Sequence, residues 1–367
     1  MLPASAPSPA AAHFPALDGL RAVAVLLVLY DHAPQVLGRD RGDAGGWWHG
    51  SGGAWIGVDL FFVLSGFLIT TILLRARGEP GAFRRFWLRR ALRILPLAWL
   101  YLAALALCAW LLPHFAHLRD PAQFGLALVY GTNVDVALRG WSAAAFGILW
   151  SLSVEEHFYL GWPLLALRAA KRTLWLVLLA VVVGTPLLRW ALLDDVGRVH
   201  VYVATWCRWD ALACGALLAL VHASPFRARW RSMANWLSVP ALAWIGAVLA
   251  VPFEAVAART PDWFFVVGYS GLAIAFTVVC TIALQPPRWL AAVLIAGPLV
   301  RIGRISYGLY VWHVLAAELV TKALGLIGGA TTLEARAGLW LVVLFAIAAA
   351  SWRWFEAPLL AWKERIR

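Results

Sequence analysis

Long apolar segments alternate with short polar ones along almost the whole chain. Each apolar segment has about 20 residues, the length that a helix needs to cross the hydrocarbon core of a bilayer. The pattern therefore predicts an all-α, polytopic integral membrane protein with about ten transmembrane helices. The predicted spans lie near residues 17–37, 54–74, 92–112, 144–167, 173–193, 204–222, 236–253, 264–284, 305–327 and 337–357.

Two segments depart from this regular alternation. The span at 204–222 is short, and it carries Arg208 and Asp210. The segment 114–143 is only mildly apolar and is interrupted by proline, glycine and asparagine. Because these residues favour turns over long helices, we predict a long loop at 114–143, with a re-entrant piece inside it as the alternative.

The two ends of the chain indicate a single membrane domain. Residues 1–16 contain no lysine or arginine and run directly into the first span. They lack the basic beginning of a secretory signal peptide, so we expect a short disordered tail there. One transmembrane domain is expected over residues 17–360. Because few residues follow the last span, we expect no fused extracytoplasmic domain of the esterase type.

The composition supports a membrane protein and excludes an ordinary soluble domain. Hydrophobic residues make up 62% of the chain and charged residues 14%, against about half and about a quarter in soluble domains. The 23 tryptophans suit the two membrane interfaces. The four cysteines all lie inside apolar segments, and none forms a Cys-x-x-Cys pair. We therefore expect neither a disulfide framework nor a metal site.

Basic residues gather in alternate gaps between the spans. The gap 75–93 holds seven arginines and one glutamate. Basic residues also fill the gaps at 168–172, 227–231 and 288–304, and the C-terminal segment 363–367. By the positive-inside rule, both chain termini are expected in the cytoplasm. This distribution accounts for the net charge of +12 without a nucleic-acid partner, so the lipid bilayer is the expected partner.

Arg21 and His32 lie eleven positions apart in the first span. Eleven steps of about 100° return a helix to within roughly 20° of the same face, about 16 Å further along. Ionisable groups inside a bilayer cost several kcal/mol, so this pair is the first candidate for a functional site. An imidazole is well suited to take a proton from a hydroxyl, and Asp31 and Asp59 are candidates to orient it. For either residue alone, a hydrogen bond between helices is the alternative.

The fourth span is dense in polar residues between Ser151 and Tyr159. Ser151, Glu155 and Tyr159 are spaced four residues apart, which places them on one helical face. The adjacent Glu155 and Glu156 cannot both be charged cheaply inside a membrane. At least one of them is expected to pair with an arginine or to stay protonated. A structural ion pair is the alternative to a role in a site.

Three other spans carry further candidates. Asp59 stands at the outer end of the second span, where a capping or snorkelling role is the alternative. Arg208, in the sixth span, is a candidate substrate contact or part of an intrahelical arrangement. In the ninth span Ser306, Tyr310 and His313 share one helical face. They suit a polar cavity, and the alternative is that His313 is a packing residue.

The basic stretch before the third span indicates a phosphate-bearing ligand. Seven arginines within residues 75–93 exceed what membrane orientation requires. Arginine forks bind phosphate oxygens through two parallel hydrogen bonds, so such a ligand is expected on the cytoplasmic face. Glu356, at the cytoplasmic end of the last span, is a candidate partner for one of these arginines. The candidate phosphate ligands are Arg84, Arg85, Arg89, Arg90 and Arg93.

Taken together, these segments resemble the acyltransferase-3 family of membrane acyltransferases, which includes sugar and peptidoglycan O-acetylases and macrolide acylases. The resemblance covers nearly the whole chain and includes the Arg21-x10-His32 spacing. His157 stands where the family commonly has glutamine, and Ala98 replaces an aromatic residue. The motifs that carry the resemblance are residues 17–21 with His32, 57–66, 89–96, 151–159, 306–313 and 354–359.

The resemblance implies an enzyme that moves an acyl group from cytoplasmic acyl-CoA, with acetyl-CoA as the expected donor, to a hydroxyl of a carbohydrate or a similar acceptor. It implies a multi-pass protein of the bacterial inner membrane and no metal. By this resemblance His32 is the catalytic base and Arg21 its partner in engaging the donor, while the five arginines hold the CoA phosphates. Direct transfer and transfer through a protein side chain both stay open, as does the oligomeric state. The remaining expected site residues are Asp59 and Glu155 near the base and, as substrate contacts, Tyr159, Arg208, Tyr310 and His313.

Two other classes of protein also place ionisable residues inside spans. A proton-coupled transporter would explain the arginine, histidine and glutamate residues, but it predicts paired repeats with interrupted helices, which the sequence does not display. A flippase or a scaffold for another glycan enzyme needs no catalytic base. Neither alternative explains the order of the motifs, so acyl transfer is the function that we expect.

Overall fold

The computed structural model describes residues 14–37, 52–141, 143–250, 260–327 and 331–363, and within these ranges the chain is helical, without strands. The α-helices are α1 (Pro15–Val36), α2 (Gly57–Arg75), α3 (Ala82–Leu111), α4 (Pro121–Leu128), α5 (Thr132–Arg139), α6 (Ala144–Gly147), α7 (Trp150–Arg168), α8 (Lys171–Val203), α9 (Trp209–His222), α10 (Arg227–Ala250), α11 (Tyr269–Ala283), α12 (Arg288–Leu294), α13 (Gly297–Arg304), α14 (Ser306–Ile327), α15 (Leu333–Ser351) and α16 (Ala357–Lys363). Short 3-10 or π segments are η2 (Pro113–Leu118), η3 (Thr205–Cys207), η4 (Phe264–Gly268) and η5 (Trp352–Glu356). Of the expected disordered tail, residues 1–13 lie outside the described residues, and α1 already begins at Pro15.

All ten predicted spans are helical over the residues that the structure describes. Within the described ranges, seven helices are long and apolar enough to cross a membrane, and they confirm the all-α, multi-pass class. Helices α1 and α7 have 22 and 19 residues, within the range that spans a bilayer, but they carry the clustered ionisable residues. Helix α9 is apolar and has only 14 residues. The total of ten crossings therefore stays a prediction.

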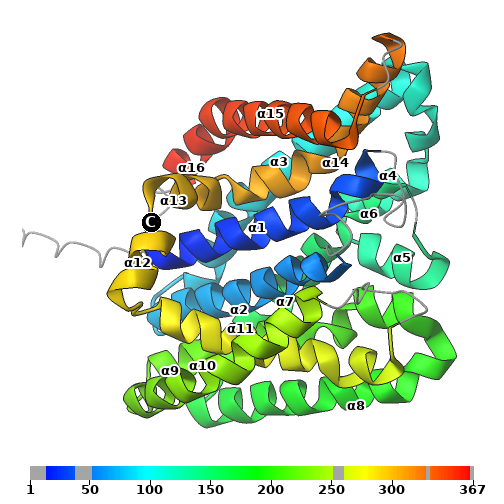
Figure 1. Ribbon diagram of the computed structural model, residues 1–367. Helices are drawn as coiled ribbons and strands as arrows, with labels where there is room; N and C mark the ends of the chain where they lie inside the picture. Colours follow the sequence, from blue (N-terminus) through cyan, green and yellow to red (C-terminus); the bar gives the residue numbers. More distant parts are fainter. Residues whose placement is uncertain (1–13, 38–51, 142, 251–259, 328–330, 364–367) are drawn as a thin grey trace, which may run out of the picture.

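The long helices lie side by side and run between two opposite ends of the molecule (Figure 1). Helix α1 packs against α2, α13 and α14, and α2 packs against α7, α9 and α11. Helix α2 is mostly buried, whereas α8 and α10 lie at the periphery, where most of their residues are at least partly exposed. Helices α12, α13 and α16 lie at the end where α1 begins (Figure 1). The two ends of the described chain thus share one end of the bundle, and the cytoplasmic side of this end stays a prediction.

Two small residues allow α2 and α9 to approach closely. A Cβ atom on Gly66 would collide with the backbone carbonyl of Leu212, and one on Gly215 would collide with that of Val63. Gly66 and Gly215 therefore permit close packing of the two helices. Gly57 makes the same kind of approach to the backbone of α1. These contacts fix α1, α2 and α9 as the packed centre of the bundle.

The segment 114–143 is the clearest difference from the sequence prediction, because it forms helices instead of a long loop. Asp120 caps α4 by accepting a hydrogen bond from the Ala122 N–H (2.9 Å), and this backbone N–H holds the pKa of Asp120 below its usual range. Pro121 occupies the first turn of α4, where its missing N–H costs nothing. Tyr130, with φ 57°, turns the chain between α4 and α5. Residues read as helix breakers therefore begin and end short helices here.

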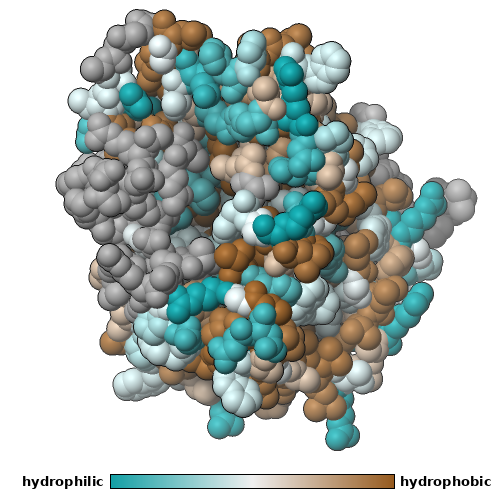
Figure 2. Space-filling view, turned by 90° about the vertical axis from the view of Figure 1, so that its right-hand side faces the viewer, coloured by the Kyte–Doolittle hydropathy of each residue, from teal (hydrophilic) through white to brown (hydrophobic). Residues whose placement is uncertain are grey.

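These short helices cap one end of the bundle. Helices α4, α5 and α6 lie opposite the end where α1 begins (Figure 1). Asn133 of α5 donates hydrogen bonds to the Thr205 hydroxyl (2.7 Å) and the Val203 carbonyl (3.3 Å), which ties this cap to the connection between α8 and α9. Figure 2 shows this end face, where groups of hydrophilic residues are spread between hydrophobic ones. Such a mixed surface suits contact with water and headgroups instead of the hydrocarbon core.

Helix α8 breaks at Gly197, which explains the short sixth span. Gly197 has φ 80° and ψ 171°, a backbone conformation that residues with a Cβ rarely adopt. The chain beyond this break packs into the bundle, so that His200, Val201, Tyr202 and Val203 are all buried. Helix α9 consequently begins inside the bundle and needs fewer residues to reach the opposite end. The position of Arg208 deep in the protein follows from this break.

Candidate active site

The histidines predicted on the first and ninth spans lie together in the structure. The ring centroids of His32 (α1) and His313 (α14) are 5.0 Å apart, and the ring planes meet at 73°. His313 is fully buried, whereas the side chain of His32 is 29% exposed. Of the two rings, His32 is the one that a substrate can reach without a change in packing.

Backbone carbonyls fix which nitrogen of each ring carries the hydrogen. The Nδ1 atom of His32 lies 3.0 Å from the Val28 carbonyl oxygen, and that of His313 lies 2.6 Å from the Tyr310 carbonyl oxygen. A carbonyl oxygen only accepts, so both Nδ1 atoms donate, and in the neutral rings the lone pair is on Nε2. The Nε2 of His313 is buried without a hydrogen-bond partner among the described residues. The Asp31 carboxylate lies 3.9 Å from Nδ1 of His32, close enough to stabilise an imidazolium.

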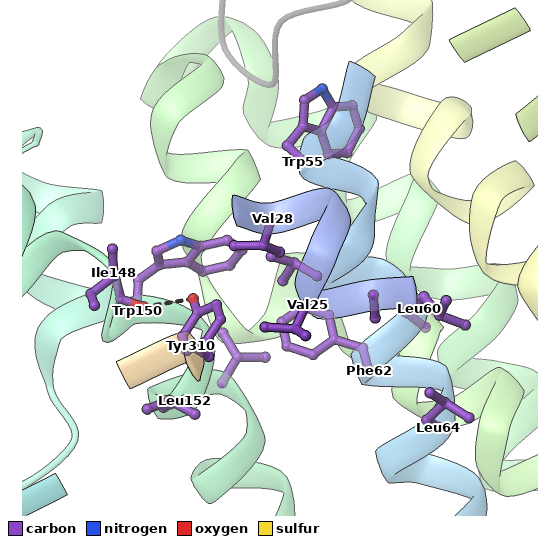
Figure 3. Packing of buried hydrophobic residues seen from close by; sticks show 14 of the residues in the cluster. Val25, Val28, Trp55, Leu60, Phe62, Leu64, Ile148, Trp150, Leu152 and Tyr310 are labelled. Atoms are coloured by element: carbon purple, nitrogen blue, oxygen red, sulfur yellow. Dashed lines mark hydrogen bonds between the residues drawn. The ribbon is translucent and has the colours of Figure 1, made fainter. Parts of the chain in front are cut away.

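Tyr310 connects this histidine pair to α6 and α7. Its hydroxyl donates to the Ile148 carbonyl (2.8 Å; Figure 3). The same oxygen lies 2.7 Å from the Ser151 hydroxyl. Because the single phenolic hydrogen is used on Ile148, Ser151 is the donor of the second bond. Tyr310 is buried among apolar side chains of α1, α2 and α7 (Figure 3), so it holds the helices in place around the histidines.

A second polar cluster lies about three helical turns away along α1, around Arg21. The Ser65 hydroxyl of α2 donates to Glu155 Oε1 of α7 at 2.6 Å. The guanidinium of Arg90 (α3) stacks over the ring of Tyr159 at 4.0 Å. Arg21 interacts electrostatically with both Arg90 and Glu155. The predicted face of α7 is confirmed, since Ser151, Glu155 and Tyr159 each bond or stack with another helix.

The five arginines proposed for phosphate binding fall into two groups. Arg90 and Arg93 lie among the charges around Arg21, and Arg90 Nε is buried without a hydrogen-bond partner among the described residues. Arg84 and Arg89 are exposed at the surface, and Arg85 lies 3.8 Å from Glu79. Two of the five arginines therefore face the polar interior of the bundle. Arg93 also interacts with Glu356, the partner expected at the end of the last span.

Asp59 and Arg208 form a buried ion pair with each other. Arg208 Nη2 donates to Asp59 Oδ1 at 2.6 Å, and both side chains are almost wholly buried. The Arg208 guanidinium also packs on the Tyr269 ring, 4.3 Å from its centroid. The carboxylate that the structure places beside His32 is Asp31, while the hydrogen bond of Asp59 goes to Arg208.

The ion pair between Arg189 and Asp210, close to the pair of Asp59 and Arg208, was not predicted from the sequence. Arg189 of α8 donates to Asp210 Oδ2 at 2.9 Å, and Ser270 donates to the same oxygen at 2.6 Å. Arg189 is fully buried and also donates to the carbonyls of Val266 and Cys207. The position of Arg189 inside the fifth predicted span indicated that this arginine needs a buried partner. Asp210 lies on another helix, however, so no local spacing in the sequence identifies it as that partner.

Among the residues that the structure describes, no group of three or more histidine, cysteine, aspartate or glutamate side chains has the geometry of a metal site. All four cysteines are free thiols. The chemistry available in the described part of the bundle is therefore that of imidazole, carboxylate, hydroxyl and guanidinium groups. The two clusters place imidazole groups near one another at one level of the bundle and guanidinium groups at another.

The comparisons with known proteins bear on this arrangement. A family described as an acyltransferase domain matches residues 14–351. The peptidoglycan O-acetyltransferase OatA of Listeria monocytogenes is 29% identical over 376 residues, which cover 95% of this chain and 56% of that protein. A Staphylococcus aureus (strain COL) protein named "Putative O-acetyltransferase" is 30% identical over 323 residues, which cover 82% of this chain and 50% of that protein. No solved structure matches.

The chain spans about half the length of these curated relatives. The matched family nevertheless covers far more than half of this chain, from before α1 to the end of α15. It includes both histidines and the cluster around Arg21. The chain therefore belongs to the acyltransferase-3 family, whose members are membrane enzymes that transfer acyl groups.

Proposed function

We propose that this chain transfers an acetyl group from cytoplasmic acetyl-CoA to a hydroxyl of a carbohydrate acceptor, with His32 as general base. The observation that carries the proposal is the hydrogen bond from His32 Nδ1 to the Val28 carbonyl. It leaves the Nε2 lone pair on a ring that is partly exposed. A base needs a free lone pair and an approach for its substrate, and His32 has both.

The cluster around Arg21 is the proposed donor side. Arg21, Arg90 and Arg93 come from two helices and approach one another despite their like charges. An arrangement of this kind is stabilised when an anion lies among the guanidinium groups. The phosphates of CoA would be held here and by the surface arginines Arg84, Arg85 and Arg89. The acyl thioester would then extend along α1 towards His32, a distance of about 16 Å along the helix axis.

The proposed reaction balances without a further reactant. Nε2 of His32 takes the proton of the acceptor hydroxyl while its oxygen attacks the thioester carbonyl carbon. The new C–O bond forms, the C–S bond breaks, and the proton passes from His32 to the departing CoA sulfur. Asp31 stabilises the imidazolium that exists between these two proton transfers. In this proposal the acyl group goes directly to the acceptor.

The other site residues have supporting roles in this proposal. Glu155 and Tyr159 hold Arg90 and Arg21 in place, and His313 and Tyr310 hold the ring of His32 from the side of α14. Asp59 and Arg208 stabilise the packing of α2 against α9 through their ion pair. The Listeria relative is named as a peptidoglycan O-acetyltransferase, which favours a carbohydrate acceptor.

The test uses the full chain reconstituted in liposomes with radiolabelled acetyl-CoA outside and a carbohydrate acceptor inside. Wild type is compared with His32→Gln and with the control His114→Gln, which changes an exposed histidine of η2. We expect labelled acceptor with wild type and the control, and none with His32→Gln. Equal labelling with His32→Gln would overturn the role of His32. Movement of acceptor across the membrane without acetylation would favour the transporter or flippase.

A further inference from the structure

A pocket lies between α9, α10 and α11, away from the two histidines and from the cluster around Arg21. It lies where α9 ends and α10 begins, at the end of the bundle where α1 also begins (Figure 1). By the charge pattern of the loops, this end faces the cytoplasm. The residues that line it are Leu218, Val221, His222, Arg227, Trp230, Arg231, Thr281, Leu284 and Gln285.

The charged residues of this pocket are basic. Arg227 and Arg231 line it, and Arg75 of α2 interacts with the adjacent His222. None of the nine lining residues is acidic. Elsewhere in the described bundle the buried arginines Arg189 and Arg208 each have a carboxylate partner. A basic pocket without a carboxylate in its lining suits an anion.

One hydrogen-bond donor in the pocket, Nη1 of Arg231, is available to a ligand. Arg231 Nη2 donates to the Gln285 backbone carbonyl at 2.5 Å, which fixes the guanidinium. Its Nη1 is buried and has no hydrogen-bond partner among the described residues. A buried, charged donor without an acceptor is costly, and an oxygen of a bound anion would remove that cost. The fork geometry of arginine matches two oxygens of one phosphate.

Several of the other lining residues are apolar, and the pocket lies beside the exposed apolar side chains of α10. Leu218, Val221 and Leu284 contribute aliphatic walls. The Trp230 indole N–H donates to the Thr281 hydroxyl at 2.9 Å, which fixes the ring at the pocket. Helix α10 carries highly exposed apolar side chains, among them Trp236, and Phe226 beside Arg227 is 62% exposed. A ligand here therefore meets basic and apolar surfaces together.

We propose that this pocket binds the headgroup phosphate of an anionic phospholipid from the cytoplasmic leaflet. Arg231 and Arg227 contact the phosphate oxygens, and the acyl chains lie along the exposed face of α10. Basic pockets between transmembrane helices on the cytoplasmic side are suited to such headgroups. A free phosphate would satisfy the arginines as well, but it would leave the apolar wall beside α10 without a contact. This inference does not depend on the proposed reaction.

The experiment measures lipid binding to the purified full chain by native mass spectrometry. Phosphatidylglycerol and phosphatidylcholine are offered in equal amounts. We expect wild type to retain phosphatidylglycerol preferentially, and the double variant Arg227→Gln/Arg231→Gln to lose about tenfold or more of that preference. The matched control is Arg229→Gln, because Arg229 lies on the same turn of α10, is exposed and is not part of the pocket. It should keep the preference of the wild type.

Three results would overturn the proposal. The first is an unchanged lipid preference in the double variant, and the second is an equal loss in Arg229→Gln. The third is displacement of phosphatidylglycerol by inorganic phosphate or CoA at millimolar concentration, which would assign the pocket to a soluble anion.

If the double variant does not fold, Arg227→Gln alone is used, because Arg227 is exposed. It should weaken the preference partially. Failure of the acetylation assay would not affect any of these measurements.

Discussion

His32 and His313 are 281 residues apart in the sequence, yet their rings meet with centroids 5.0 Å apart inside the bundle. In each ring, Nδ1 donates a hydrogen bond to a backbone carbonyl of its own helix. The lone pair of each neutral ring is therefore on Nε2. The partly exposed ring belongs to α1 and the buried ring to α14. His32 is therefore the ring that can be contacted from outside the packed core, and His313 packs beside it.

The first prediction concerns His32 itself. His32→Gln removes the base but keeps a polar side chain of similar reach, so we expect kcat for acetyl transfer to fall by at least about 100-fold. The melting temperature should change little, because the ring is partly exposed. Acetyl transfer from labelled acetyl-CoA and thermal unfolding in detergent provide the two readouts. Retention of more than a tenth of the wild-type kcat would contradict the role of general base.

The second prediction concerns the stacking of Arg90 on Tyr159. Arg90→Lys keeps the charge but loses the planar fork and its stacking contact, which lies at 4.0 Å from the ring. We expect KM for acetyl-CoA to rise roughly tenfold, with a smaller change in kcat. Steady-state kinetics with varied acetyl-CoA provide the measurement. Arg172→Lys, on the exposed first turn of α8, is the matched control and should keep the wild-type KM.

The third prediction separates a structural role of Asp59 from a catalytic one. Asp59→Asn leaves the buried Arg208 without its counter-charge, and we expect a loss of about 3–5 kcal/mol in the free energy of unfolding. The double variant Asp59→Leu/Arg208→Met replaces the pair by apolar side chains and should recover most of that stability. It should also recover acetyl transfer. A stable but inactive double variant would instead place Asp59 in the reaction.

The fourth prediction concerns the contact between α2 and α9. Gly66→Ala would push a methyl group into the Leu212 carbonyl, so we expect a destabilisation of about 1–3 kcal/mol. Gly184→Ala is the matched control, because a Cβ atom there meets nothing within 4 Å. In the interior of α8 this change should be neutral or slightly stabilising. Unfolding of both variants in the same detergent compares them. Similar stability of the two would show that α2 and α9 can separate without cost.

The local patterns of the sequence were sufficient for much of the architecture. The length of each apolar segment predicted the long helices, because a bilayer admits only segments that satisfy their own backbone hydrogen bonds. The spacing of Ser151, Glu155 and Tyr159 predicted one face of α7, since helical periodicity is a local property. Both predictions rest on geometry within a few turns of one helix.

The segment 114–143 indicates where local patterns fail. Pro121, Gly131 and Gly140 were read as evidence for a loop, but they lie at the boundaries of short helices. Proline is tolerated in the first turn of a helix and glycine is tolerated after the last one. The same residues therefore occur in loops and at helix ends. Packing of these helices on the end of the bundle decides between the two outcomes.

By itself the sequence determined which segments form long apolar helices and which polar residues share a helical face, because both follow from the fixed repeat of one helix and the thickness of a bilayer. Only the tertiary structure decided which polar side chains of different helices contact one another. Ser65 meets Glu155, Asp59 meets Arg208, and His32 meets His313, each from a different helix. Such pairs depend on the rotation and depth of two helices, which are fixed by packing over the whole bundle and not by the residues near either partner.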